Sequence, residues 1–356
     1  MRISAITLTI LTLLFLTACA EGEENLSVDT DRQTITFTPI KNQGANETCW
    51  AYAMLATIEA NRLRMGDSVH LSVGYAVRHL IEDSYRSYVL SGGATPFTTR
   101  ATAQTLLNIM ERHGMVPHDS YNRYDKNIST ANKVETSGEQ RVNTTVLANK
   151  VKRMAQMAVN MRKGPEMKAD KVRQALNESL GHLPKCVMML GAEYTPMEFA
   201  RSVCAPGEYK ALTSFTHHPF YADFVLEVPD NWERNTFYNL PIDSLVGIVN
   251  ASLEQGYAVC WEGDISEKGF SFRRGMACIT EKTDLSQEAR QKDFESYKTT
   301  DDHAMCIIGI KTGDDGKRRY IIKNSWGTNN PHHGLMYMTE EYLRMKTVAV
   351  WIKSKI

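Results

Sequence analysis

One cysteine near the start of the chain has the setting of a reactive thiol. Cys49 precedes Trp50 and an amphipathic run up to Leu63 with apolar residues at helical spacing, so we expect Cys49 at the first turn of a helix. The free N–H groups and the partial positive charge of a helix N-terminus stabilise an anion, and the thiolate is the nucleophilic form of cysteine. The position of Cys49 therefore predicts a nucleophile.

Two polar residues in the preceding loop are candidates for the same site. Gln43 lies beside Gly44, and its side-chain amide can donate a hydrogen bond to an oxyanion that develops next to the sulfur. Glu47 places a carboxylate close to the thiol. We expect Glu47 either to raise the thiol pKa or to bind a substrate amine.

A histidine and an asparagine farther along the chain can complete the site. His303 begins the apolar run HAMCIIGIK and Asn324 ends the run RRYIIKN, and both runs have the composition of strands. An imidazole can take the thiol proton, and an amide oxygen can orient the ring without adding charge. Trp326 is placed to shield that bond from water. The alternative is a buried structural thiol at Cys49, a core histidine and a turn asparagine.

These residues, taken together, resemble the motifs of the papain-like cysteine peptidases. Their order along the chain is the family's order: Gln43-Gly44, Cys49-Trp50, His303, and Asn324-Ser325-Trp326-Gly327. From Pro39 onward the chain is similar to bleomycin hydrolase and bacterial aminopeptidase C, in the segments LSVGYAVRH, EYTPMEFA, FTHHPFY, EGDISEKGFSF and KNSWGTNNPHHGLMYMTEEY. The resemblance implies a thiol peptidase that hydrolyses peptide bonds with a Cys-His-Asn mechanism, is of aminopeptidase type and needs no cofactor.

The resemblance leaves the specificity open. Aminopeptidase action in this group depends on a C-terminal arm, and this sequence ends at VAVWIKSKI soon after its last expected strand, which puts that specificity and the group's hexameric cage in doubt. A lipid-anchored endopeptidase and a non-catalytic peptide-binding lipoprotein are the alternatives, and a homo-oligomer is left open. In the family a Gly-Gly segment pairs with the substrate backbone, a role that falls here on Gly93, whereas a plain turn is the alternative.

The expected architecture is a two-lobe papain-like α+β fold over residues 39–356. A helical lobe carries Cys49, and an antiparallel sheet or partial barrel carries His303 and Asn324. Helices are expected at 70–88, at 102–115 and at 243–255. Two further amphipathic helices flank Gly164-Pro165 and predict a helical insertion at about 125–200. The site then lies in the cleft between the lobes.

The N-terminus has the pattern of a bacterial lipoprotein. A positive residue and an apolar run lead to Leu16-Thr17-Ala18-Cys19, which predicts a signal peptide over 1–18, lipidation of Cys19 and a tether over 19–38. An ordinary cleavage site with an incidental cysteine is the alternative. Ala20 favours the outer membrane of a Gram-negative bacterium, so we expect a lipid-anchored, extracytoplasmic protein that faces either the periplasm or the outside.

Charge and the remaining candidate ligands narrow the function further. The net charge is zero, without a basic block, which offers no footprint for nucleic acid. The doublets His217-His218 and His332-His333 lack further ligands at suitable spacing, so we expect loop histidines and no metal. Cys186 and Cys204 are free to pair, but the sequence does not settle whether they do.

Overall fold

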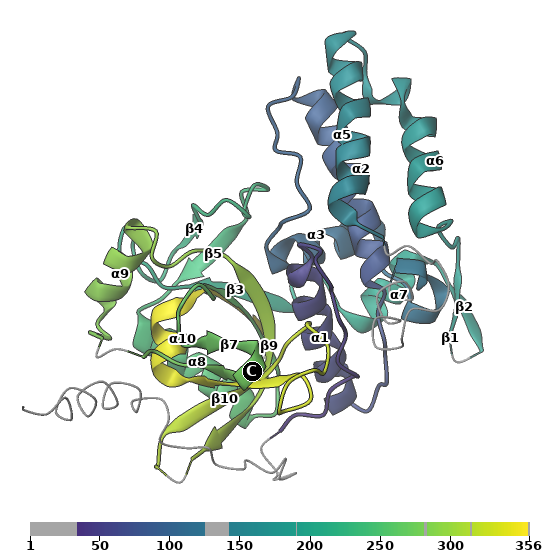
Figure 1. The fold of residues 1–356 in the computed structure, drawn as a ribbon. Helices are drawn as coiled ribbons and strands as arrows, with labels where there is room; N and C mark the ends of the chain where they lie inside the picture. The colour runs from purple at the N-terminus through teal and green to yellow at the C-terminus, as the bar shows by residue number, and fades with distance from the viewer. Residues whose placement is uncertain (1–33, 125–141, 190, 281–282, 314, 355–356) are drawn as a thin grey trace, which may run out of the picture.

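The helix that begins with Cys49 lies between the sheet and the other helices (Figure 1). The computed structural model describes residues 34–124, 142–189, 191–280, 283–313 and 315–354. Helix α1 (Cys49–Arg64) packs on α2 (Val73–Leu90) and α3 (Ala103–His113) on one side, and on the sheet on the other. Nearly every residue from Trp50 to Asn61 is buried, as expected for a helix enclosed in a core.

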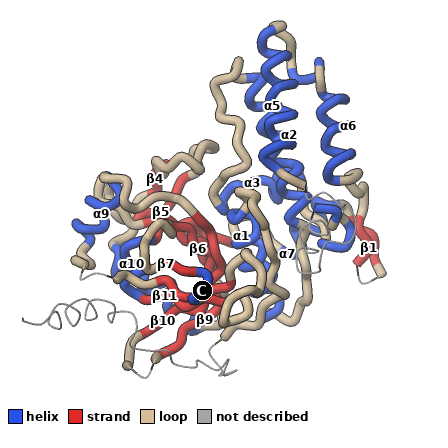
Figure 2. The backbone as a smooth tube through the Cα atoms, viewed as in Figure 1, coloured by secondary structure: helices blue, strands red, loops and turns tan. Residues whose placement is uncertain are grey.

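Ten strands form one mostly antiparallel sheet, drawn in red in Figure 2. Only the pairs β3 with β5 and β8 with β11 are parallel among the described residues. The central strands β6, β9 and β10 are buried apolar runs because helices cover them. In sheet order the strands are β4 (Asp223–Val225), β5 (Thr236–Asn239), β3 (Tyr209–Thr213), β12 (Thr347–Lys353), β6 (Val259–Gly263), β9 (His303–Thr312), β10 (Arg318–Lys323), β11 (Leu335–Thr339), β8 (Met276–Ala277) and β7 (Phe270–Ser271).

Part of the helical lobe stands away from the sheet, as Figure 1 shows. Helix α5 (Thr144–Asn160) packs along α2 and against α6 (Ala169–Leu180), and both new helices fall within the segment where we predict an insertion. Other elements complete the chain. They are η1 (His118–Ser120), η3 (Pro165–Met167), β1 (Val187–Met189), β2 (Ala192–Tyr194), α7 (Pro196–Val203), α8 (Ile242–Glu254), η4 (Phe272–Arg274), α9 (Gln287–Glu295) and α10 (Glu340–Lys346).

The helix boundaries follow local signals in the sequence. Ser72 caps α2 by accepting the backbone N–H of Tyr75 at 3.2 Å, as its position before an apolar stripe predicts. Helix α3 ends at Gly114, which has a φ of +83°. The predicted helices at 70–88, 102–115 and 243–255 correspond to α2, α3 and α8, with ends that differ by a few residues.

The lipoprotein features lie outside the described residues. This applies to the signal peptide, to Cys19 and to most of the tether, and it applies to the first part of the predicted insertion. Within the described ranges, none of the helices combines the length and the apolar character needed to cross a membrane. The described cysteines, Cys186 and Cys204 included, are free thiols, so the structure contains no disulfide between these two.

Gly114 offers a test of how α3 is joined to α7. A Cβ at Gly114 would lie 2.4 Å from the backbone carbonyl carbon and oxygen of Pro196, whereas a Cβ at Gly66, which also has positive φ, meets no atom within 4 Å. Both Gly→Ala changes carry the strain of positive φ, about 1 kcal/mol, but only Gly114→Ala adds a clash with backbone. We expect urea unfolding to show that Gly114→Ala costs several kcal/mol more than Gly66→Ala. Equal losses would contradict the close approach.

Candidate active site

Cys49 occupies the first turn of α1, as predicted from the sequence. Its side chain is half-buried, and the backbone N–H groups of Ala304 and Trp50 reach its sulfur. Ala304 follows His303 at the start of β9, so the sulfur lies beside the strand that carries the histidine. Burial raises the pKa of the Cys49 thiol to about 12, and the carboxyl groups of Glu262 and Asp230 add to that rise.

The ring of His303 is held by Asn324. The Nε2 atom of His303 lies 2.9 Å from the Oδ1 atom of Asn324 at the end of β10. The backbone N–H of Ser325 donates to the same Oδ1 at 2.7 Å, which identifies that atom as the amide oxygen. Nε2 must therefore carry the proton and donate it to Asn324. In the neutral ring this leaves Nδ1 as a proton acceptor.

Aromatic rings cover this hydrogen bond. Trp326 stacks on His303 with ring centroids 4.6 Å apart, and Phe270 and Phe272 meet Trp326 edge-on at 5.9 and 5.6 Å. Both His303 and Asn324 are buried. The position of Trp326 fits the shielding role predicted for it, because water that competes for the Asn324 oxygen is kept out.

Burial disfavours a lone charge on either reacting group. Burial lowers the pKa of His303 to about 4, and the hydrogen bond from His303 to Asn324 offsets part of that shift. The lowered pKa of His303 and the raised pKa of Cys49 together favour a neutral thiol and a neutral imidazole in the site without substrate. Proton transfer from Cys49 to His303 creates two opposite charges together, which stabilise each other where neither is stable alone.

Gln43 is fixed in a loop that is tied to both lobes. Its Nε2 donates to the Asn46 carbonyl at 2.8 Å, its Oε1 accepts the Ser325 hydroxyl at 2.6 Å, and its own N–H donates to the Ser325 carbonyl at 2.8 Å. An amide nitrogen has two hydrogens, so one remains for a ligand. Asn46 in turn accepts the N–H of Thr144 at 3.0 Å, which ties this loop to the start of α5.

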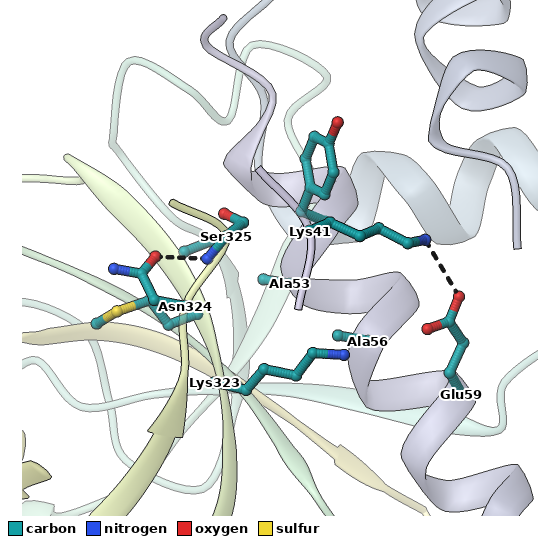
Figure 3. A pocket seen from close by; sticks show the side chains of 10 residues that line it. Lys41, Ala53, Ala56, Glu59, Lys323, Asn324 and Ser325 are labelled. Atoms are coloured by element: carbon teal, nitrogen blue, oxygen red, sulfur yellow. Dashed lines mark hydrogen bonds and ion pairs between the residues drawn. The ribbon is translucent and has the colours of Figure 1, made fainter. Parts of the chain in front are cut away.

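A buried charge network lies behind the site, between α1 and β10 (Figure 3). Glu59 of α1 is 1% exposed and lies 3.5 Å from the Lys41 ammonium. Its carboxylate also accepts the N–H of Leu71 at 2.8 Å and the hydroxyl of Thr38, which itself accepts from Lys323 at 2.9 Å. Lys41, Glu59 and Lys323 line a cavity of about 20 Å³, enough for one water molecule.

This network connects the helix of Cys49 to the strand that leads to Asn324. Lys323 directly precedes Asn324, and Glu59 lies on the same helix as Cys49. Burial alone would raise the pKa of Glu59, but the ammonium groups of Lys41 and Lys323 and the Thr38 hydroxyl lower it overall. Burial likewise lowers the pKa of Lys323, and Glu59 counters that shift. The ionised forms of Glu59 and Lys323 thus stabilise each other.

Two predicted substrate-binding residues lie apart from these contacts. Gly93 lies in the turn after α2 with a φ of +94°, and its N–H donates to Tyr88. Thr99, farther along this loop, contacts α1 through its carbonyl, which accepts the Trp50 indole N–H at 3.0 Å. Glu47 is exposed, and its charge acts on Arg100 and Asp230.

Sequence reasoning missed the carboxyl groups next to the thiol. Glu262 and Asp230 are the residues whose charge raises the Cys49 pKa, and Asp301 lies beside them. The single glutamate in the buried strand VCWEG was a signal for Glu262. No sequence signal placed Asp230 there, because it comes from a loop after β4.

The doublet His217-His218 has a glutamate beside it in the structure. Glu227 bridges the Nε2 atoms of His217 and His218 at 3.1 and 2.7 Å, so a third potential metal ligand is present that the sequence spacing did not reveal. However, the amide nitrogen of Gln291 donates to Nδ1 of His217 at 3.0 Å. Nε2 of His217 must then carry the proton, which suits a hydrogen bond to Glu227 and not a metal bond.

The charge network predicts a large effect of Glu59→Gln on stability. The substitution keeps the shape but leaves the Lys41 and Lys323 ammonium groups without their anion. Breaking a buried ion pair in this way costs about 3–5 kcal/mol. We expect urea unfolding to show a loss of this size for Glu59→Gln and a loss below about 0.5 kcal/mol for Glu254→Gln, an exposed control. Similar losses for both variants would contradict the role of the network.

Comparison with known proteins agrees with this geometry. The sequence profile of the Peptidase C1-like family matches residues 101–356, a range that includes His303 and Asn324 and begins after Cys49. Rat (Rattus norvegicus) and human (Homo sapiens) bleomycin hydrolases are each 29% identical to the chain over 136 residues, which cover 34% of this chain and 29% of each relative. The chain thus spans less than a third of these relatives.

A solved structure shares the fold. PepW from Lactobacillus rhamnosis has a TM-score of 0.70 at 16% identity, with 91% of this chain and 82% of PepW covered. The predicted papain-like α+β fold is confirmed. Because the family profile covers most of the chain and the fold agrees with it, the chain belongs to the Peptidase C1-like family of papain-like cysteine peptidases.

Proposed function

We propose that the protein hydrolyses peptide bonds with Cys49 as the nucleophile and His303 as the general base. The thiol proton moves to Nδ1 of His303 as the sulfur attacks the scissile carbonyl. The imidazolium then gives this proton to the leaving amine, and water releases the acyl group from the sulfur with His303 again as the base.

One observation carries this proposal. The Ser325 N–H identifies the oxygen of Asn324, so the His303 proton is placed on Nε2 and the acceptor on Nδ1. A histidine that only filled the core would not need a fixed tautomer. Here the tautomer is the one that a base for Cys49 requires, and Ala304 keeps the strand of His303 in contact with the sulfur.

The tetrahedral intermediate needs donors for its oxyanion. Gln43 has one amide hydrogen left after its bond to Asn46, and its orientation is fixed by Ser325. The backbone N–H of Cys49 at the start of α1 is a second donor, because the first N–H groups of a helix have no partner within it. Preorganised donors of this kind typically contribute about 3–4 kcal/mol to the stabilisation of a transition state.

We further propose an aminopeptidase of bleomycin hydrolase type. The similarity to the rat and human bleomycin hydrolases supports this finer assignment, although it involves a third of the chain. The carboxyl groups beside Cys49 also support it, since an aminopeptidase must recognise a free ammonium group near the bond that it cleaves. An endopeptidase remains the competing outcome of the test below.

The test compares fluorogenic peptides that have a free N-terminus with the same peptides acetylated, using the full-length protein in detergent. We expect turnover of the free peptides, little turnover of the acetylated ones, and a loss of more than about 10⁴-fold in kcat for Cys49→Ala. Equal cleavage of acetylated peptides would make the protein an endopeptidase. If neither peptide is cleaved in a Cys49-dependent way, the peptidase proposal is wrong.

We also propose that lipidation at Cys19 anchors the protein outside the cytoplasm, on the basis of the Leu16–Cys19 pattern. In a Gram-negative host, the wild-type protein should incorporate labelled fatty acid and sediment with the outer membrane. Cys19→Ser should lose the label and the membrane fraction, whereas Cys186→Ser, at an exposed cysteine, should keep both. Label retained in Cys19→Ser would refute the anchor.

A further inference from the structure

Glu262 is a buried carboxyl group beside the nucleophile that the mechanism does not use. It lies on β6 directly opposite Ala304, whose N–H reaches the Cys49 sulfur, and its side chain is 4% exposed. Its Oε2 accepts the N–H of Ala103 at 3.2 Å, at the first turn of α3. Across the described residues, no donor contacts Oε1, and this oxygen is not among the fully enclosed polar atoms without a partner.

The other buried glutamate of this site shows what a structural carboxylate looks like here. Glu59 receives the Thr38 hydroxyl, the Leu71 N–H and an ammonium group from Lys41. Its pKa is lowered despite burial because these partners compensate its charge. Glu262 has one backbone donor in place of all these partners. A purely structural role does not explain why a carboxyl group lies there with no hydrogen-bond donor for Oε1 among the described residues.

The surroundings of Glu262 are short of positive charge. Asp301 accepts the N–H of Asp230 at 3.0 Å, and the Nε of Arg100 lies 2.9 and 3.1 Å from the two oxygens of Asp230. Arg100 is thus already engaged by one carboxylate. Burial and the charge of Asp230 raise the pKa of Asp301 to about 7, and burial together with Asp301 and Asp230 raises the pKa of Glu262.

We propose that Glu262, supported by Asp230 and Asp301, receives a cationic nitrogen of the peptide substrate next to the bond that Cys49 attacks. This inference rests on the proposed peptidase function and names its substrate class, which is peptides with an ammonium or guanidinium group beside the scissile bond. The group is either a free N-terminus or a Lys or Arg side chain. It would supply the partner that Oε1 lacks and the positive charge that the carboxyl groups need.

Binding of a cation in this site is coupled to proton release. A cation favours the ionised form of Glu262 and Asp301, so the affinity for a Lys or Arg side chain, which stays charged, rises with pH through the pKa of Asp301, about 7. Neutral peptides have no such dependence. The charged and titratable groups that interact with Glu262, directly or through Asp230, include Glu47, Cys49, Arg100, Asp230, Cys260, Asp301 and Asp302.

The first experiment measures kcat/KM for two matched pairs of peptides. The first pair has one sequence, with a free or an acetylated N-terminus. The second pair is acetylated and has either Lys or norleucine beside the scissile bond. We expect the wild-type protein to prefer a cationic peptide over its neutral match by at least about tenfold. Glu262→Gln should lose that preference, so that the ratio of kcat/KM for each cationic peptide to that of its neutral match falls to about one, whatever the change in the absolute rates. Glu178→Gln, at an exposed glutamate on α6, should behave as wild type. The free and Lys peptides distinguish the two sources of the cation.

A second experiment separates failure of this inference from failure of the peptidase proposal. Binding of labelled peptides to Cys49→Ala, followed by fluorescence anisotropy between pH 6 and 8, requires no turnover. Tighter binding of both cationic peptides, increasing with pH for the Lys peptide, whose ammonium stays charged over this range, and absent in Cys49→Ala/Glu262→Gln, supports the inference. Cys49-dependent cleavage without any preference for cations, or equal and pH-independent binding of all four peptides, would overturn the inference and leave the peptidase proposal intact.

Discussion

The buried charges between α1 and β10 hold the helix that begins with Cys49 against the strand that leads to Asn324. Glu59, Lys41, Lys323 and Thr38 are too costly to bury separately, so the helix and the strand stay together at one distance and one register. Cys49 begins that helix and Asn324 follows that strand. Residues of α1 also pack on β9, but apolar surfaces slide more readily than matched charges. The relative position of Cys49 and Asn324 therefore depends on this electrostatic contact.

Much of this arrangement could be predicted from the sequence, because local patterns encode it. The cap at Ser72, the apolar strands and the helix start at Cys49 are each set by a few neighbouring residues, and the structure has all of them. The pairing of His303 with Asn324 was predictable from motif order. The roles of Glu47 and Gly93 stay predictions, since the structure shows neither in contact with the sulfur.

What the sequence did not reveal depends on contacts between distant segments. Asp230 reaches the site from a loop after β4, Arg100 from the loop before α3, and Glu262 from the middle of β6. No local spacing brings these residues together, and only the register of β6 against β9 shows that Glu262 faces Ala304. For the same reason, the sequence did not reveal that Glu227 contacts the histidine doublet or that Thr99 contacts Trp50. Long-range charge pairs were thus the part of the site that required coordinates.

Ser325 contacts both Asn324, which holds the His303 ring, and Gln43. Its N–H shares the Asn324 oxygen with His303, while its hydroxyl and carbonyl hold Gln43. The positions of His303 and Gln43 are therefore not independent, because a shift of this one residue displaces the partners of both. Under the proposed mechanism, a distortion of this strand end would therefore impair proton transfer and oxyanion binding together, although the two steps use different side chains.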